Sequence, residues 1–387
     1  MKTRLVALMA LALGMASCQG DNLFGAGSGS EVDVQLSFNA PELIGETRTD
    51  GDSYAQLNSA YGGIDYLDGA PLGDSRYVDW DDVDIRYSLE VYDAADLTAP
   101  IKDRKVVIKD KYAPVQFDVR LIAGREYRFA VFADFVDNGL AEQAISSDAD
   151  AQRNLGLRHT IGDNLTDITI LQDKDALNDE VADAYFAYFN YTPNEEAQNN
   201  LVEKTLTRPY AKVRVVATDL AELNLNVHPK YITVKFNSDI VIPTAFNAVK
   251  GKISGDKSLE GKSISATYVD KIRDNRVNHV YNSDYDEMVV LADNGTERAS
   301  HLTLFSDYIL ATSGEHTPIN FTMTVLDEKM VKIREVEFDT QIPIERNYLT
   351  TIVGNVLTKV TEVNVSINDD FNNSKNSEDE PFYEEVE

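Results

Sequence analysis

The chain has 387 residues, with 36 basic and 65 acidic side chains, and so carries a formal net charge of −29. Because a chain this acidic repels a phosphate backbone, we expect no nucleic-acid partner. The single cysteine rules out an internal disulfide, a zinc site held by several cysteines and an iron–sulfur cluster. The length suggests about two domains.

Residues 1–17 have the pattern of a secretory signal peptide. Two basic residues precede an apolar run from Leu5 to Ala16, which is shorter than the ~20 residues that a membrane-spanning helix needs. The run leads to Cys18, an order that resembles a bacterial lipoprotein signal, in which the cysteine becomes the lipidated first residue. We therefore expect lipidation at Cys18, with a buried thiol as the alternative. Residues 18–30, rich in Gly, Ser, Asp and Asn, predict a flexible tether.

A half-buried strand is predicted from Glu31 to Phe38, where polar and apolar residues alternate throughout. Its apolar face consists of Val32, Val34, Leu36 and Phe38. The segment from Asn39 to Tyr77 is dominated by Gly, Asp, Ser and Pro, which indicates a long loop.

Short strand-like runs, separated by polar turns, then fill most of the chain. In the first half they are Ile85 to Tyr92, Lys105 to Lys109, Pro114 to Leu121 and Tyr127 to Phe135. In the second half they are Ala211 to Thr218, Tyr231 to Phe236, Met288 to Asp293, Leu302 to Leu310, Ile319 to Leu326, Val331 to Phe338, Tyr348 to Leu357 and Thr361 to Ile367. Short helices are expected at Glu142 to Arg153 and at Asp175 to Ala187.

This pattern predicts a mainly β fold with an antiparallel β-sandwich in each half and a few short helices. The polar stretch from Pro193 to Asn200 is the expected linker. We therefore place the N-terminal domain at residues 31–200 and the C-terminal domain, with its acidic tail, at residues 201–387.

The sequence offers little that could carry out catalysis. None of the five histidines has another histidine four residues away, which is the spacing of a helical metal site. The five are His159, His228, His279, His301 and His316. There is no Gly-x-Ser-x-Gly elbow after a strand, and no phosphate- or dinucleotide-binding glycine pattern. Paired carboxylates are expected by chance in so acidic a chain. We expect no enzyme activity, no cofactor and no catalytic residue.

An acidic cluster from Asp79 to Asp84 is the one segment that resembles a metal loop. Glu90 has the spacing of the last EF-hand ligand, but Asp84 stands where that loop requires glycine. An EF-hand is therefore excluded, and no metal site is assigned. A looser surface calcium site and an acidic strand edge both stay open, and Trp80 within the cluster could stack on a sugar or simply pack.

Two further segments carry a family resemblance. Residues 342–358 read IPIERNYLTTIVGNVLT, and residues 206–213 read LTRPYAKV. The first closely resembles the closing-strand signature of the fimbrillin family, and the second resembles the segment that opens the second domain in that family. Its members are type V pilins and related surface lipoproteins of Gram-negative gut and oral bacteria. The lipoprotein signal, the alternating first strand and the following Glu46-Thr47-Arg48 fit the same order.

The resemblance implies two transthyretin-like β-sandwich domains in tandem. In polymerising members a trypsin-like protease cuts after an arginine beyond the first strand, and the next subunit fills the groove that this strand leaves. The matching residue here is Arg48. The alternative is that the strand stays in place and Arg48 is an ordinary surface arginine.

The C-terminal end departs from the family pattern. Residues 368–387 are dominated by charges and contain Pro381, which removes a ladder hydrogen bond, so they make a poor donor strand. Residues 361–367 do alternate, but they could be needed to close their own domain. The chain could therefore accept a strand without offering one.

Together these observations predict a lipid-anchored, surface-exposed protein of the bacterial outer membrane or of a fimbrium. It would act in adhesion as a fimbrial or accessory subunit, with other fimbrial subunits and a processing protease as partners. The alternative is a stand-alone surface lipoprotein that binds a glycan or another ligand and does not polymerise. The role as stalk, tip or anchor stays open.

Overall fold

The computed structural model describes residues 29–39, 83–109, 115–139, 157–171, 180–195, 200–217, 219, 222, 229–255, 258–260, 263–268, 289–290, 297–298, 302–314, 316–327, 329–358 and 363–368. Strands dominate these residues, and most neighbouring strands run antiparallel, so the predicted mainly β fold is confirmed. The transthyretin-like arrangement in two domains stays a prediction.

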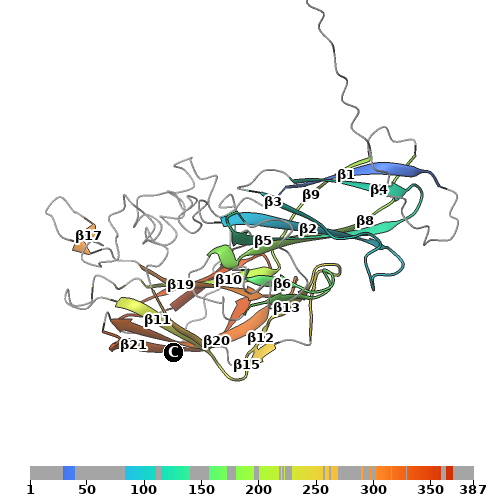
Figure 1. Ribbon diagram of the computed structural model, residues 1–387. Coiled ribbons are helices and arrows are strands. Elements are labelled where there is room, and N and C mark those ends of the chain that lie inside the picture. Colours follow the sequence, from blue (N-terminus) through green and yellow to red (C-terminus); the bar gives the residue numbers. More distant parts are fainter. Residues whose placement is uncertain are drawn as a thin grey trace, which may run out of the picture.

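The first half of the chain forms two facing sheets (Figure 1). The smaller sheet has the order β4-β1-β9, with bounds β4 (Val115–Ile122), β1 (Glu31–Asn39) and β9 (Asn200–Thr205). The larger sheet has the order β3-β2-β5-β8, with bounds β3 (Lys105–Lys109), β2 (Val83–Asp93), β5 (Tyr127–Asp137) and β8 (Ala184–Tyr191). One apolar cluster, which we call the β1 core, draws side chains from both sheets, including Leu36, Phe117, Tyr87 and Phe129.

The second half contains two larger sheets and two short ribbons. One sheet has the order β19-β10-β22-β23, with bounds β19 (Leu302–Leu310), β10 (Tyr210–Ala217), β22 (Leu349–Gly354) and β23 (Val363–Asn368). The other has the order β16-β11-β20-β21, with bounds β16 (Ser263–Tyr268), β11 (Pro229–Phe236), β20 (Thr317–Asp327) and β21 (Lys332–Ile344). The ribbons pair β12 (Val241–Pro243) with β15 (Ser258–Glu260), and β17 (Val289–Val290) with β18 (Glu297–Arg298).

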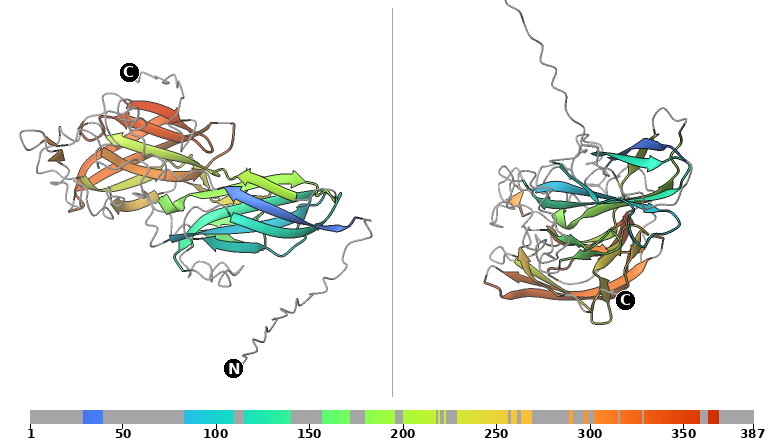
Figure 2. Two further views of the ribbon diagram at one scale, coloured as in Figure 1. Left: turned by 90° about the horizontal axis from the view of Figure 1, so that it is seen from above. Right: turned by 45° about the vertical axis from the view of Figure 1, so that its right-hand side comes forward.

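A seventh sheet joins the two halves. Its order is β14-β13-β7-β6, with bounds β14 (Lys252–Ile253), β13 (Ala245–Asn247), β7 (Ile168–Ile170) and β6 (His159–Ile161). We call it the joining sheet because two of its strands precede residue 200 and two follow it. Figure 2 shows the two halves at opposite ends of an elongated molecule. A buried cluster including Phe132, Phe186, Tyr210 and Phe246 also contains residues of both halves.

Some elements of the structure differ from those that the sequence predicts. A helix was expected from Asp175 to Ala187, but β8 begins at Ala184, and the helical element with described bounds there is a single 3₁₀ turn, η5 (Glu180–Ala182). The aromatic run of β8 fits a pleated, half-buried surface better than a helix. Strand β9 begins at the last residue of the expected linker and pairs with β1. The predicted domain bounds stay a prediction. The helix expected from Glu142 to Arg153 lies outside the described residues.

Candidate functional site: the β1 strand and the joint between the halves

Strand β1 is the middle strand of its sheet. Its antiparallel ladder with β4 runs from Glu31 opposite Ile122 to Phe38 opposite Val115. Its other edge forms a parallel ladder with β9, which begins at Val34. Removing β1 would therefore uncover one edge of β4 and one edge of β9, and unpaired strand edges are templates for strand addition.

The predicted inward face of β1 lies in the core. Val34, Leu36 and Phe38 are fully buried, and Val32 is half-buried. Burying three such side chains contributes roughly 4 to 9 kcal/mol. On the other face Gln35 is exposed, and its side-chain amide donates a hydrogen bond to the Asp118 carboxylate at 3.3 Å. Together, the side chains left around an empty β1 position would form an apolar groove, which we call the β1 groove.

An aromatic cluster closes the Phe38 end of the β1 groove. The Phe38 ring lies edge-on to Phe117, with centroids 6.0 Å apart, and tilted against Phe189 at 6.4 Å. Phe189 in turn stacks on Phe129 at 5.3 Å. Aromatic pairs of this geometry add to the free energy of area burial. Phe38 is therefore the side chain of β1 with the most specific surroundings.

The opposite end of β1 is held by backbone contacts just before the strand. The Ser30 N–H donates to the Glu195 carboxylate at 2.8 Å, and the Ser30 carbonyl accepts from the Ala123 N–H at 2.9 Å. A Cβ on Gly29 would come within 2.5 Å of the Ala123 carbonyl oxygen, so this close approach requires glycine. Within the strand, Glu31 to Asp33 pair with β4 alone.

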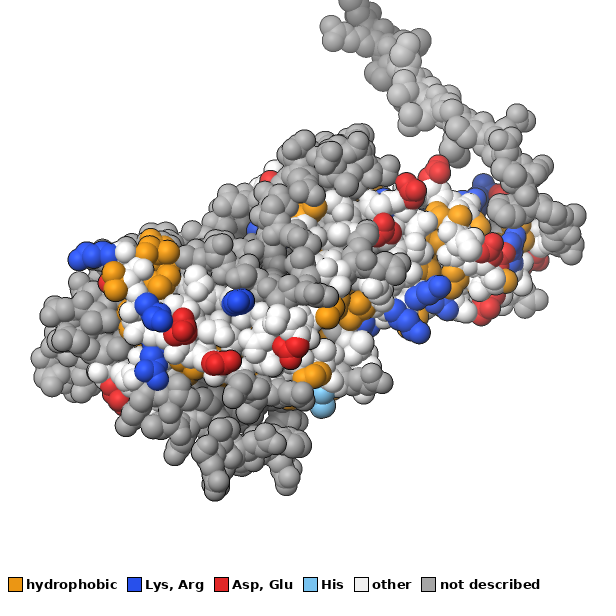
Figure 3. Space-filling view, turned by 90° about the horizontal axis from the view of Figure 1, so that it is seen from below, with side chains coloured by type: hydrophobic (Ala, Val, Ile, Leu, Met, Phe, Trp, Pro, Cys, Tyr) orange, Lys and Arg blue, Asp and Glu red, His pale blue; other side chains and the backbone are white. Residues whose placement is uncertain are grey.

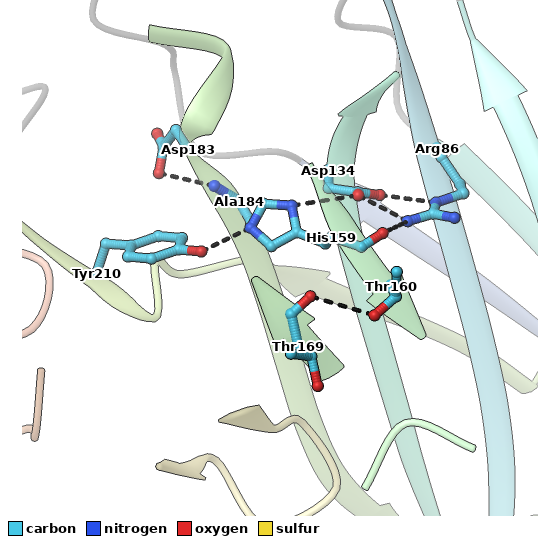
Figure 4. A network of polar contacts seen from close by, with 8 residues as sticks. All are labelled: Arg86, Asp134, His159, Thr160, Thr169, Asp183, Ala184 and Tyr210. Carbon is cyan, nitrogen blue, oxygen red and sulfur yellow. Dashed lines mark hydrogen bonds and ion pairs between the residues drawn. The ribbon is translucent and has the colours of Figure 1, made fainter. Parts of the chain in front are cut away.

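A second constellation, which we call the polar joint, lies between the halves (Figure 4). Arg86 of β2 donates to both carboxylate oxygens of Asp134 on β5, at 2.8 and 2.7 Å, and to the carbonyl of His159 on β6 at 3.2 Å. The His159 ring places Nδ1 3.3 Å from Asp134 and Nε2 2.6 Å from the Tyr210 hydroxyl on β10. All four side chains are nearly or fully buried, so the polar joint links strands of three sheets away from water.

Charge decides the state of Asp134. Burial alone would raise its pKa, but the Arg86 guanidinium and the His159 side chain outweigh burial and hold the pKa below its ordinary value. Asp134 is therefore an anion at neutral pH, paired with a guanidinium that cannot lose its proton. Such a pair fixes geometry and offers no free acid or base.

A neighbouring ion pair strengthens the same region. Arg208 donates through Nε to Asp183 at 2.5 Å and through Nη2 to the Tyr185 hydroxyl at 3.2 Å, and its guanidinium lies 4.9 Å from the centre of the Tyr185 ring. Both Arg208 and Tyr210 belong to the segment 206–213 that carries one of the two sequence resemblances. That segment therefore connects the halves through buried polar contacts.

Comparison with known proteins identifies a family. Residues 26–383 match a family of unknown function, DUF6562. The chain belongs to this family. None of the curated proteins matches it.

Several solved structures resemble this DUF6562 chain at low identity. A fimbrial assembly protein from Parabacteroides distasonis is 13% identical, with a TM-score of 0.38, over 87% of this chain and 96% of its own. A proposed adhesin from Bacteroides thetaiotaomicron is 10% identical, with a TM-score of 0.40, over 89% and 98%. A proposed cell adhesion protein from Bacteroides ovatus is 10% identical, with a TM-score of 0.41, over 88% and 98%.

The remaining predicted site residues of the DUF6562 chain lie mostly outside the described residues, which include neither Cys18 nor Arg48. Lipidation and processing at these two residues therefore stay predictions, as does the displacement of Val32, Val34, Leu36 and Phe38. None of the helices in the described ranges is long and apolar enough to cross a membrane.

The acidic segment is described only in part. Asp84 is buried and accepts a hydrogen bond from the Gly139 N–H at 2.9 Å. Glu90 is paired with Arg104 at 2.7 Å and accepts from the Leu165 N–H at 2.7 Å, so its carboxylate already has partners. Residues 79–82 lie outside the description, and among the described residues no group of three His, Cys, Asp or Glu side chains could hold a metal ion.

The polar joint was missed by sequence reasoning. Of the histidines, His159 is a core residue, while His316 lies at the surface near Glu345. The available signal was Asp134, a charged residue inside the apolar run of β5, whereas β2 alternates polar and apolar residues, so that Arg86 reads as an exposed residue. That signal predicts a buried partner but does not say which one.

On the face seen in Figure 3, acidic and basic side chains of the described residues are interspersed.

Proposed function

We propose that this protein is a cell-surface subunit of fimbrial type, in which β1 is replaced by a strand from a neighbouring subunit. The observation that carries the proposal is the position of β1, which pairs on both edges and buries Val34, Leu36 and Phe38. A strand that replaces β1 would gain two backbone ladders and the same apolar surroundings.

Proteolysis would release β1. Arg48 lies between β1 and Val83, where the next described strand begins. A cut after Arg48 would therefore break the covalent link between β1 and the other strands of its sheet. A trypsin-like protease has the matching specificity. The resemblance of residues 206–213 and 342–358 to fimbrillin signatures supports the same order of events.

The anchoring part of the proposal is lipidation at Cys18, which would tie the uncut chain to the outer membrane. Because Cys18 and Arg48 lie on either side of β1, the cut would leave β1 on the lipid-linked fragment. The rest of the chain would then leave the anchor and enter a fimbrial assembly that serves adhesion.

The test uses the unlipidated mature chain beginning at Gln19. Limited trypsin treatment should give a fragment with Thr49 as its first residue, and the cut protein should bind an added peptide of residues 30–40 that the uncut protein does not bind. Arg48→Gln should abolish both results. Lys252→Gln, which removes an exposed basic residue of β14 in the joining sheet, is the matched control and should change neither.

Two outcomes would count against the proposal. A chain that trypsin cuts after Arg48 but that then binds no peptide of residues 30–40 would contradict assembly by strand replacement. If the uncut monomer also bound glycans, the stand-alone binding protein would be the better description.

A further inference from the structure

The β1 groove is not equally selective along its length. Backbone ladders to β4 and β9 can be formed by almost any extended segment, so selectivity must come from side chains. Val34 and Leu36 are branched aliphatic side chains of the β1 core, and another branched side chain could take their places. The Phe38 position instead faces the rings of Phe117 and Phe189, with Phe129 behind them.

A smaller side chain at the Phe38 position would leave unfilled space. Protein cores are packed as densely as organic crystals, and a cavity left by a large-to-small change adds a penalty to the lost transfer free energy. An aliphatic side chain would also lose the edge-on ring contact with Phe117. The Phe38 position should therefore discriminate between strands more strongly than the positions of Val34 and Leu36.

Apart from β1, which stays on the fragment that the cut removes, the alternating segment near the C-terminal end is the candidate donor, residues 361–367. In the register that fills all three buried positions, Val363, Val365 and Ile367 take the places of Val34, Leu36 and Phe38. This register puts a smaller side chain at two positions, including the aromatic one. The reversed direction also leaves an aliphatic residue at the Phe38 position.

Shifting the register does not help. Moving the segment by two residues puts Asp369 at the Phe38 position, and moving it by four brings in Phe371 but puts Asp369 at the Leu36 position. An unpaired buried carboxylate is strongly unfavourable. Moreover, β23 already pairs with β22 along its whole length, from Val363 to Asn368.

We infer, on the basis of the function proposed above, that the β1 groove selects a strand with an aromatic side chain at the Phe38 position. Its partner is therefore a different subunit, not a second copy of this chain. The partner segment has the pattern apolar, polar, apolar, any, aromatic, in which the polar residue takes the exposed position of Gln35. The Phe38 position is the specificity-determining site of assembly.

The experiment measures how synthetic strands bind the mature chain after it has been cut behind Arg48. A labelled peptide of residues 30–40 is the probe, and fluorescence anisotropy gives its affinity. Unlabelled competitors are the same peptide, its Phe38→Ile and Leu36→Val variants, a peptide of residues 359–369, and that peptide with Ile367→Phe. Because only peptides are changed, no variant protein needs to fold.

Phe38→Ile should weaken competition by about tenfold or more, whereas Leu36→Val should weaken it by about fivefold. The peptide of residues 359–369 should compete poorly, and Ile367→Phe should improve it by about tenfold. Equal competition by the Phe38→Ile and unchanged peptides would overturn the inference while leaving strand replacement intact. So would tight binding of the unmodified 359–369 peptide. Failure of the 30–40 peptide itself to bind would overturn strand replacement, and the inference with it.

Discussion

The β1 core and the polar joint hold the molecule together in different ways. β1 is held by backbone ladders and by apolar contacts of Val34, Leu36 and Phe38. The polar joint is held by buried charges, in which the Arg86 guanidinium meets the Asp134 carboxylate through two hydrogen bonds. One region lies at an outer sheet of the first half, and the other lies between the halves.

The difference concerns how replaceable each contact is. Apolar burial is non-directional, so any strand of suitable shape can restore what β1 supplies. A buried ion pair is different, because removing one partner leaves an uncompensated charge in the core. The two regions therefore suit opposite tasks, exchange at β1 and permanence at the joint.

The largest effect is expected from a charge placed in the β1 core. Leu36→Asp removes a fully buried side chain and introduces a carboxylate without a partner, so the free energy of unfolding should fall by about 5 kcal/mol or more. Urea denaturation measures this change. Leu201→Asp is the matched control on the neighbouring strand β9, where the side chain is 47% exposed, and should cost less than about 1 kcal/mol. Equal losses in the two variants would contradict the burial of β1.

The polar joint should respond next most strongly. Asp134→Ala leaves Arg86 buried without its anion and should lower the free energy of unfolding by about 3 to 5 kcal/mol. Replacing both partners, with Arg86→Met and Asp134→Leu, should recover much of this loss, because two apolar side chains need no partner. Additive losses in the double variant would show that the pair does not act as a unit.

A smaller effect is expected at alkaline pH in the β1 core. Burial raises the pKa of Tyr87 to about 12, and its hydroxyl has no hydrogen-bond partner among the described residues. In the unfolded chain a tyrosine loses its proton near pH 10. As the pH rises, deprotonation therefore begins in the unfolded state and stabilises it. The contribution of Tyr87 to the free energy of unfolding is complete below pH 10 and falls by roughly 3 kcal/mol as the pH rises to 12.

Urea denaturation at intervals from pH 9 to 12 measures that loss. Tyr87→Phe should remove this part of the pH dependence, whereas Tyr188→Phe, at a side chain that is 43% exposed, should leave it in place. A profile that Tyr87→Phe does not change would indicate that Tyr87 does not titrate from a buried position.

The sequence predicts those features that depend on neighbouring residues and misses those that depend on contacts between distant segments. The alternation from Val32 to Phe38 is a property of neighbouring residues, and the structure has a strand there whose apolar face points inward. The pairing of β1 with β9 joins segments far apart in the chain, and no local pattern encodes it. The joining sheet was missed for a further reason. Its strands have only two or three residues each, which is too few to show a clear alternation.

The candidate site divides in the same way. The three buried residues of β1 could be predicted, because each follows from a two-residue period. The polar joint could not, because Arg86, Asp134 and His159 come from separate strands whose register is set by tertiary packing. A charged residue in an apolar run shows that a partner must exist, but finding that partner requires the fold.

The parallel ladder between β1 and β9 has a mechanical consequence. Because the two strands point the same way, a pull on the N-terminal end of β1 and on the C-terminal end of β9 would slide them past each other along their common axis. All hydrogen bonds between them would then bear the load together instead of opening one by one, as they would when a hairpin is peeled apart. A force applied to the chain in these two places would strain this sheet in its most resistant direction.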